Sequence, residues 1–386
     1  ISMMKVISRT GQLAFYRENS MLIELINTDN IDLGDIKLHP ALINLFCAYR
    51  EGKHLLFSDE AFLQQVSKHT EFGSLTCNTA MNLMSKTIEY KQLKSKLTYY
   101  CKVDLSNNSN TAIHQQEDFF VVGYAYFNDT ANIQVSKLLC EDINDAKLYN
   151  LISKHYRQTN GFNGIDIKFE FLNGGGANIK HNFDMIKSSD RFCLCLLDSD
   201  KKHPKSGVGS TAAKFNRAND SATCKHYIME PHEIESLIPL EVIEQGLKDK
   251  IINTKYSFAY EQTSALTAYK PITKLYFDHK EGLTIHGALN IDHKYKDDFW
   301  QEALMNSKNL KRKGCLTKLH CECDPPCIAI PGFGTGLLDA GTEIINKMTH
   351  IKITELFPTI ILEQWFKIGL DLTSWGCTSS SRARSS

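Results

Sequence analysis

Between residues 134 and 238, short apolar runs alternate with amphipathic runs, and this alternation constrains the fold more than any other feature. Apolar runs predict strands at 134–140, 166–172, 191–197 and 226–229, while helical periodicity predicts helices at 145–156, 178–188 and 232–238. Strands that alternate with helices favour a mainly parallel sheet with helices on both faces. The nearly continuous apolar run RFCLCLL at 191–197 is typical of a central strand. We therefore expect an α/β core.

The composition excludes several classes of protein. The 386 residues, with 42% hydrophobic and 23% charged side chains, are those of a globular protein rather than a disordered or collagen-like chain. The 44 basic and 44 acidic residues cancel, which excludes binding driven by a strongly cationic surface but leaves room for a local basic face. No apolar run is long enough to span a bilayer and no secretory signal is recognisable. We therefore expect a cytoplasmic protein with reduced cysteines and no membrane contact.

The chain is expected to divide into three regions. Residues 1–115 are predicted to form a mainly helical N-terminal domain, because helical patterns fill the first hundred residues. The polar, turn-rich segment DLSNNSN at 104–110 marks the boundary. Residues 116–290 carry the alternating pattern and form the central domain. Residues 291–386 form a small C-terminal region with an apolar helical stretch at 354–375, which we expect to dock onto a partner or a second copy of the chain.

Acidic residues follow two of the predicted strands. Glu141 and Asp142 come directly after the first, with Asp145 one helical turn later, and Asp198 and Asp200 come directly after the third. The carboxyl ends of parallel strands meet at one edge of a sheet, and the two carboxylates of a D-x-D there should project in similar directions. Grouped carboxylates suit Mg²⁺ or Mn²⁺, and one or two such ions support displacement at phosphorus. The alternative is that these acids cap helices and fill turns.

Three segments resemble motifs of TOPRIM proteins. LLCEDINDAKLY at 138–149 resembles the first TOPRIM motif, an apolar strand that ends in glutamate before a helix. FCLCLLDSD at 192–200 resembles the second, an apolar strand that ends in D-x-D. HEIESLIP at 232–239 resembles the acidic segment of TOPRIM nucleases of the overcoming-lysogenization-defect kind, which have relatives among retron and abortive-infection effectors. The resemblance implies a central TOPRIM domain, which is Rossmann-like and has helices on both faces of its sheet.

The resemblance also implies a set of site residues. The metal ligands would be the motif glutamate, its helical neighbour, the D-x-D pair and two later acids: Glu141, Asp145, Asp198, Asp200, Glu233 and Glu235. Nucleases of this kind use a lysine late in the domain, and Lys280 in YFDHKEGL takes that place, unless it is a solvated surface lysine. The catalytic residues would be Glu141, Asp198, Asp200 and Lys280. Asp142 departs from the motif, which often has glycine after its glutamate.

The activity implied by this resemblance is Mg²⁺- or Mn²⁺-dependent endonuclease cleavage of phosphodiester bonds in DNA or RNA, tRNA included, by an antiviral defence effector. The nucleases it resembles carry a fused ATPase domain, but G-x-x-x-x-G-K-[ST] occurs nowhere in this chain. We therefore expect an ATPase or sensor protein that acts in trans. The alternative from another class is a non-catalytic regulatory or sensor module that binds a cation or nucleic acid without cleavage.

Four cysteines lie close together in the last quarter of the chain: Cys315, Cys321, Cys323 and Cys327. Clustered thiols suit a closed tetrahedral Zn²⁺ site, which would stabilise a loop that has few core contacts. Because the spacing is not a pair of C-x2-C knuckles, free cysteines and an iron–sulfur cluster remain alternatives. A zinc ion here would be structural, since four thiolates leave no open coordination position. The nearby PGFGTG at 331–336 predicts a backbone turn, because it lacks the third glycine of a nucleotide-binding loop.

Overall fold

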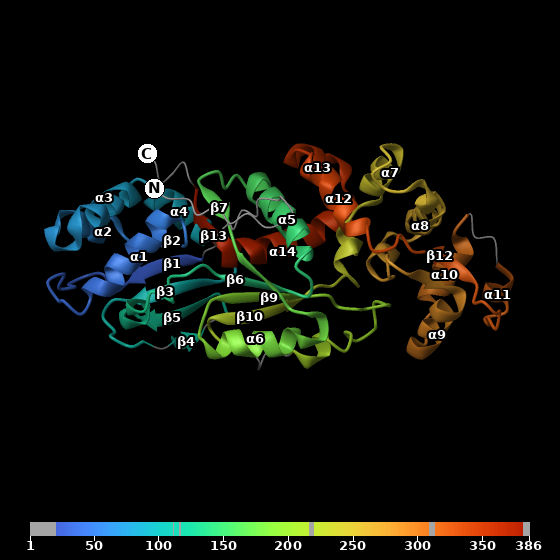
Figure 1. The fold of residues 1–386 in the computed structure, drawn as a ribbon, viewed down its shortest axis with the longest axis horizontal. Coiled ribbons are helices and arrows are strands. Elements are labelled where there is room, and N and C mark those ends of the chain that lie inside the picture. Colours follow the sequence, from blue (N-terminus) through green and yellow to red (C-terminus); the bar gives the residue numbers. More distant parts are fainter. Residues whose placement is uncertain (1–20, 111, 116, 216–219, 309–312, 381–386) are drawn as a thin grey trace, which may run out of the picture.

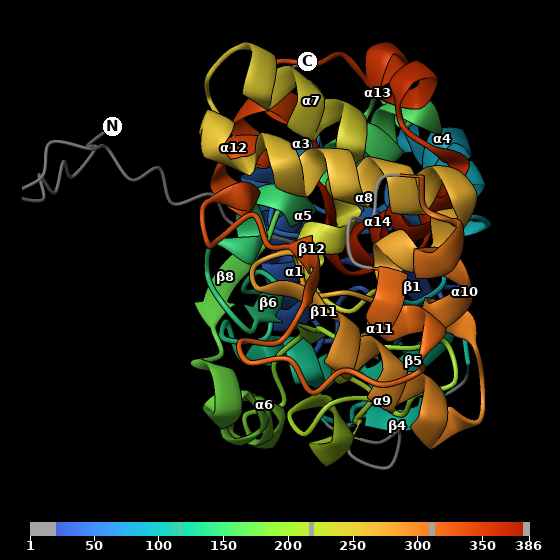
Figure 2. The ribbon, with the colours of Figure 1, turned by 90° about the vertical axis from the view of Figure 1, so that its right-hand side faces the viewer.

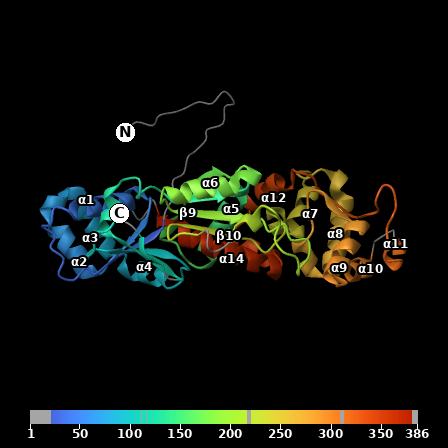
Figure 3. The same ribbon diagram turned by 90° about the horizontal axis from the view of Figure 1, so that it is seen from below.

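The computed structural model describes residues 21–110, 112–115, 117–215, 220–308 and 313–380. Figure 1 shows an elongated molecule, with the N-terminal region at one end, a central sheet in the middle and a mainly helical region at the other end. The view from below in Figure 3 shows the same order along the long axis. Within these residues, every helix is too short or too polar to cross a membrane.

The central sheet consists of four parallel strands in the order β10-β9-β6-β8. Its strands and the helices between them are β6 (Lys137–Cys140), α5 (Asp145–Thr159), β8 (Glu170–Asn173), α6 (Ile179–Ser188), β9 (Cys193–Leu197) and β10 (Cys224–Ile228). The prediction of an α/β protein with a parallel sheet between helices is confirmed, and β9 lies inside the sheet. The chain leaves β6 toward β8 on one side and then crosses to β9 on the other. The carboxyl ends of β6 and β9 therefore flank a topological switch point, where open α/β sheets bind ligands.

The side chains of β9 enter two separate cores. Cys193, Cys195 and Leu197 point to the face covered by α6. Leu194 and Leu196 belong to the opposite core, on the side of α5. Because side chains alternate along a strand, a strand that is buried on both faces must be apolar at every position. This burial explains the uninterrupted run that the sequence shows here.

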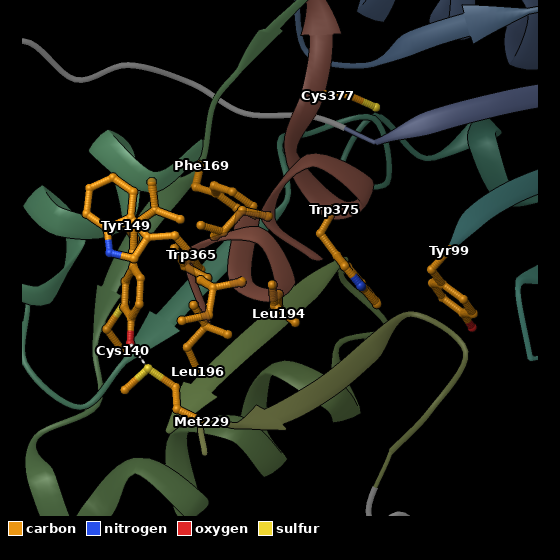
Figure 4. Packing of buried hydrophobic residues seen from close by; sticks show 14 of the residues in the cluster. Tyr99, Cys140, Tyr149, Phe169, Leu194, Leu196, Met229, Trp365, Trp375 and Cys377 are labelled. Atoms are coloured by element: carbon orange, nitrogen blue, oxygen red, sulfur yellow. Dashed lines mark hydrogen bonds between the residues drawn. The ribbon is translucent and has the colours of Figure 1, made fainter. Parts of the chain in front are cut away.

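The C-terminal helix α14 (Thr359–Gly376) packs against α5 and β9. Figure 4 shows its Trp365 and Trp375 in one cluster with Leu194 and Leu196, and all four are buried. The ring of Tyr99, from the N-terminal region, stacks on Trp375 with 5.3 Å between the ring centroids. These contacts correct the prediction that the stretch at 354–375 is a free docking or oligomer surface, because its apolar side fills the space beside the sheet of its own chain.

The strand predicted at 166–172 is divided into two strands. β7 (Ile165–Ile167) pairs antiparallel with β13 (Cys377–Ser379), while β8 continues in the central sheet. Phe169, between them, is buried, and the N–H of Lys168 donates to the carbonyl of Gly376. An added Cβ on Gly376 would lie 2.6 Å from the Phe169 ring, so glycine is needed for this approach. The segment after α14 is therefore part of the core.

The N-terminal region is built on a second sheet, in the order β2-β1-β3-β5-β4, parallel except for the edge strand β4. Its elements are β1 (Leu22–Ile26), α1 (His39–Glu51), β2 (Leu55–Phe57), α2 (Glu60–Lys68), α3 (Gly73–Met84), α4 (Thr87–Lys94), β3 (Tyr100–Asp104), β4 (Ala112–Gln115) and β5 (Phe119–Gly123). Helices fill much of this region, as predicted, but the sheet was not predicted because its strands have only three to five residues. β5 pairs with β3, so the boundary predicted at 115/116 moves to a position after Gly123.

The far end of the molecule, which faces the viewer in Figure 2, is mainly helical. It contains α7 (Leu240–Lys248), α8 (Ser257–Tyr269), β11 (Gly282–Thr284), α9 (Ile285–Tyr295), α10 (Phe299–Asn306), α11 (Lys313–Thr317), β12 (Ile328–Pro331), α12 (Leu337–Asn346) and α13 (His350–Leu356). β11 and β12 pair antiparallel. Because α14 returns from this end to the central sheet, the region predicted at 291–386 is not a separate body.

Candidate metal centre

The switch point brings Glu141 and Asp198 together. Glu141 follows β6 and Asp198 follows β9, and these strands pair in register up to Cys140 and Leu196. The Glu141 carboxylate accepts, through Oε1, a hydrogen bond of 3.0 Å from the backbone N–H of Asp198. Both side chains are half-buried. The two acidic strand ends that the sequence singles out therefore meet.

Asp145 adds a third carboxylate, from the helix that follows β6. It is the first residue of α5 and is buried, and its Oδ2 accepts the backbone N–H of Asp142 at 3.1 Å. An acid in the first turn of a helix is favoured by the helix dipole. The charge of Asp145 contributes to raising the pKa of Asp198, so the two carboxylates are electrostatic neighbours.

Glu233 and Glu235 come from the segment after β10. The short helix predicted at 232–238 is present as the 3₁₀ helix η6 (Ile234–Leu237). Glu233 and Glu235 are only 6% and 2% exposed. The Nζ atom of Lys280 lies 2.9 Å from Glu235 Oε1 and 3.6 Å from Glu233 Oε2. Lys280 therefore belongs to the same group of charges. It is not the solvated surface lysine that the sequence left as an alternative.

Hydrogen bonds fix the loop that carries Lys280. Asp278 Oδ1 accepts the backbone N–H groups of Lys280 and Glu281 at 2.9 and 2.8 Å. The carbonyl of Lys280 accepts the N–H of Gly334 at 3.0 Å. In the segment PGFGTG at 331–336, Pro331 ends β12, residues 335–336 form a turn before α12, and the N–H of Gly334 holds the lysine loop. Lys280 is positioned by backbone contacts on both sides.

Burial and mutual repulsion raise the pKa of the acids. Burial, together with the charge of Glu235, raises the pKa of Asp145 to about 7. Burial, followed by the charges of Glu141 and Asp145, raises the pKa of Asp198 well above its usual value. Burial opposes the charge of Lys280, but the carboxylate of Glu235 raises the pKa of Lys280 above its ordinary range. Burial is also the main cause of the raised pKa of Glu141, Glu233 and Glu235.

Asp200 departs from the expected D-x-D arrangement. Its backbone is left-handed, with φ 53°, and its N–H donates to the carbonyl of His232 at 2.9 Å. The strand therefore turns directly after Asp198, and the Asp200 side chain is exposed rather than parallel to that of Asp198. Its charge still contributes to the raised pKa of Glu141, which places Asp200 at the rim. Asp142 is exposed as well, and its Oδ1 accepts the N–H of Asn144 at 2.8 Å.

Sequence reasoning missed four polar residues that border these acids: His232, Lys274, Asp278 and His279. Lys274 is buried, and its Nζ lies 2.7 Å from His279 Nε2 and 3.2 Å from the carbonyl of Ser236. Burial lowers the pKa of Lys274 to about 7. The adjacency of Asp278 and His279 to Lys280 was an available signal. Lys274 lies in the 3₁₀ helix η8 (Pro271–Leu275), where no pattern marks it.

The four cysteines of the predicted zinc site converge, with their Sγ atoms within 4.8 Å of one another. The Sγ atom of Cys315 is 3.8 Å from that of Cys323 and 3.9 Å from that of Cys327. Four sulfurs about 2.3 Å from one tetrahedral zinc ion stand about 3.8 Å apart, so the cluster is compatible with structural zinc. The loop joins α11 to β12, and β12 pairs with β11, which follows Lys280 closely.

We define the acid cluster as six carboxylates that interact electrostatically with one another or with Lys274 and Lys280: Glu141, Asp145, Asp198, Glu233, Glu235 and Asp278. Six carboxylates facing two ammonium groups leave an excess of negative charge, which is costly at a partly buried site. Oxygen donors with this excess suit Mg²⁺ or Mn²⁺ in kind. Among the described residues, however, the predicted ligands Glu141, Asp145 and Asp198 do not form a group of three donors within 4.8 Å of one another, so the structure brings them near each other but not to the spacing of one ion's ligands. Comparisons of the chain with family models, curated proteins and solved structures found no match.

Proposed function

We propose that the chain is a metal-dependent endonuclease of the TOPRIM kind, which cleaves phosphodiester bonds in DNA or RNA, tRNA included. The observation that carries this proposal is the hydrogen bond between Glu141 and Asp198 at the switch point of a parallel sheet, with Lys280 close enough to act electrostatically on both. Carboxylates and an ammonium group side by side suit a divalent cation next to a phosphate. The four-stranded parallel sheet, and the order of the motif-like segments around it, support the TOPRIM assignment.

Each site residue would have a separate role in cleavage. Glu141, Asp198 and Asp200 would hold Mg²⁺ or Mn²⁺, and the acids available for a second ion are Asp145, Glu233 and Glu235. A divalent ion bound here would supply Lewis-acid polarisation of the scissile phosphate and a more acidic water. Lys280 would neutralise the charge that develops on the phosphate in the transition state. Because its Nζ is paired with Glu235, substrate binding would exchange one anionic partner of Lys280 for another.

The cysteine cluster would have a structural role beside this centre. One Zn²⁺ held by the four cysteines would order the loop between α11 and β12. β12 pairs with β11 through Gly282 and Pro331, only two residues from Lys280. An ordered cysteine loop would therefore help to fix the position of Lys280 through the pairing of β11 with β12.

The resemblance to nucleases of the overcoming-lysogenization-defect kind also suggests a cellular role for the chain. We place the chain in the cytoplasm as an anti-phage defence effector that acts with a separately encoded ATPase or sensor protein. No P-loop motif occurs in these 386 residues, so in this proposal ATP hydrolysis takes place outside them. The purified chain alone would then cleave weakly. Full cleavage by the chain alone, unchanged by any added partner, would contradict this part of the proposal.

A cleavage assay tests the activity. The purified chain is incubated with supercoiled plasmid, single-stranded DNA and tRNA, each with Mg²⁺, Mn²⁺ or EDTA. We expect at least one substrate to be cut when a divalent ion is present and none in EDTA. If every substrate stays intact while the chain binds Mn²⁺ and nucleic acid, the non-catalytic regulatory module is the correct function.

A further inference from the structure

His232, Glu233 and Asp278 form a group of donors at one side of the acid cluster. One ligand atom from each residue lies within 4.8 Å of the others. His232 and Glu233 follow β10, while Asp278 belongs to the loop that carries Lys280. The group differs from the rest of the acid cluster because it contains an imidazole.

The His232 ring lacks a partner for one of its nitrogens. The residue is 4% exposed, and Nδ1 is buried without a hydrogen-bond partner in the described part of the chain. The other nitrogen, Nε2, lies 3.9 Å from Asp278 Oδ2, which is too long for a good hydrogen bond. Nε2 is therefore the nitrogen that faces the carboxylate, and it is the ring atom that can bind an ion held between His232, Glu233 and Asp278.

Backbone hydrogen bonds hold the three donors in place. The N–H of His232 donates to the carbonyl of Leu275 at 2.6 Å, and its carbonyl accepts the N–H of Asp200 at 2.9 Å. Asp278 uses Oδ1 for two N–H groups of its own loop, so Oδ2 remains for His232. Glu233 accepts a backbone N–H of that same loop. Donors that are fixed in this way need little reorganisation to bind an ion.

We propose that His232, Glu233 and Asp278 bind one Mn²⁺ ion, at a site distinct from that of Glu141 and Asp198. Metal–ligand bonds of about 2.1 Å place two ligands of one ion roughly 3 to 4.3 Å apart, and the 3.9 Å between His232 and Asp278 lies in this range. An imidazole ligand suits a first-row transition ion better than Mg²⁺ or Ca²⁺, which prefer oxygen, and among these transition ions Mn²⁺ is the one that best suits the two carboxylates.

The role of this ion depends on the proposed function, but its binding does not. Lys280 Nζ lies 3.6 Å from Glu233, so the ion would sit beside the cation that faces the phosphate. In a nuclease it would be the second ion of the two-metal centre, and of the acids named above for that ion only Glu233 would be a ligand, together with His232 and Asp278. The chain would then combine an all-oxygen site at Glu141 and Asp198 with a nitrogen-containing site at His232.

Mn²⁺ is also the probe for the test, used with the full chain. Electron paramagnetic resonance counts free Mn²⁺ in a titration, and its pulsed form detects the nitrogen of a histidine ligand. We expect two bound Mn²⁺ ions per chain, one of them coupled to nitrogen. In His232→Gln the nitrogen coupling should vanish, and that ion should bind roughly tenfold or more weakly. His181→Gln is the matched control, because His181 is exposed on α6 and should change neither result.

Asp278→Asn provides a second variant in case His232→Gln does not fold, since an amide oxygen can still accept the two loop N–H groups. It should weaken the nitrogen-coupled ion and leave the other. If wild-type Mn²⁺ shows no nitrogen coupling, or if both variants bind Mn²⁺ as wild type does, the second site is refuted whatever the cleavage assay gives. If the nitrogen-coupled ion binds but Glu141→Gln leaves metal binding unchanged, the second site stands and the proposed nuclease centre fails.

Discussion

The carboxylate of Glu141 accepts a hydrogen bond from the backbone N–H of Asp198, and this contact joins the ends of two neighbouring strands across 57 residues of sequence. It fixes the direction of the Glu141 side chain at the switch point. It also explains how two negative side chains tolerate each other, because one oxygen of Glu141 is satisfied by the main chain of its neighbour. The acid cluster therefore has a rigid side, at β6 and β9, and a side supplied by loops, at Glu233 and Asp278.

The contact between α14 and α5 predicts that Gly369→Ala destabilises the fold. An added Cβ on Gly369 would lie 2.5 Å from the Cβ of Tyr156, an atom that cannot move without its helix. Alanine favours a helix by about 1 kcal/mol over glycine, but overpacking of a core costs about 1–3 kcal/mol. We expect a net loss of stability, measured as a lower urea midpoint. Gly336→Ala is the control, since an added Cβ there meets nothing within 4 Å. An unchanged midpoint for Gly369→Ala would show that α14 does not pack as described.

His54 predicts a loss of stability in acid. The ring is buried, with Nδ1 accepting the N–H of Met21 at 3.0 Å and Nε2 3.1 Å from the carbonyl of Gln134. Burial lowers the pKa of His54 to about 3 from 6.5. Above pH 6.5 the ring is neutral in both states. As the pH falls below 6.5, His54 binds a proton in the unfolded chain but not in the folded chain. The free energy of unfolding therefore falls by about 1.4 kcal/mol per pH unit until the pH reaches the pKa of His54 in the folded state.

Urea unfolding between pH 7.5 and 4.5 measures this effect. His54→Gln should show a flatter dependence on pH than the wild type, although it will be less stable at pH 7.5. His181→Gln, in which an exposed histidine is replaced, should keep the wild-type slope. Equal slopes for wild type and His54→Gln would mean that His54 is not buried as a neutral ring.

The cysteine geometry predicts about one zinc per chain, detected by X-ray fluorescence or metal mass spectrometry. The double variant Cys321→Ser with Cys323→Ser should lose this zinc and lower the Tm by roughly 5 °C or more, because metal binding contributes directly to folding. Cleavage per folded molecule should fall less, since Cys321 and Cys323 are not members of the acid cluster. Cys47→Ser, a half-buried cysteine of α1, should leave both zinc and Tm unchanged. Carefully purified protein without zinc would refute the site.

The sequence predicts those parts of the fold that have a clear local pattern of hydrophobic residues. The run RFCLCLL predicts a central strand because both of its faces are buried, and β9 is that strand. The N-terminal sheet was missed because a three-residue strand such as β2 leaves no periodic signal. Periodicity also does not say which sheet a segment joins, which is why residues 119–123, the strand β5, lie on the wrong side of the predicted boundary at 115/116.

Among the site residues, Glu141 and Asp198 follow from strand ends, and Lys280 follows from the resemblance alone. The stack of Tyr99 on Trp375 and the burial of Lys274 depend on contacts between distant segments, so they required the structure. Asp200 shows the limit of motif reasoning. Its D-x-D spacing predicted two parallel side chains, but the left-handed backbone at Asp200 turns its side chain to the rim.

Asp198→Asn and Glu141→Gln test the centre directly. Both changes keep the size of the side chain and remove one charge, and glutamine at 141 keeps an oxygen for the N–H of Asp198. Each should lower the cleavage rate roughly a hundredfold or more, since electrostatic groups of this kind act on the transition state. The double variant should be little worse than either single one, because the residues act as a unit. Asp142→Asn is the matched control. Because Asp142 is exposed, its replacement should lower the cleavage rate much less.

The stability of these variants separates a functional role from a structural one. The mutual repulsion of the carboxylates, which contributes to the raised pKa of Asp198, destabilises the metal-free fold, so Asp198→Asn should leave the Tm unchanged or slightly higher. In excess Mg²⁺ the wild type should instead have the higher Tm, because it gains stability from an ion that the variant binds weakly. Thermal unfolding with EDTA and with Mg²⁺ measures both limits. If Asp198→Asn and Glu141→Gln cleave as the wild type does, and gain the same stability from Mg²⁺, the acids at this switch point are helix caps and turn residues, and the TOPRIM nuclease proposal is wrong.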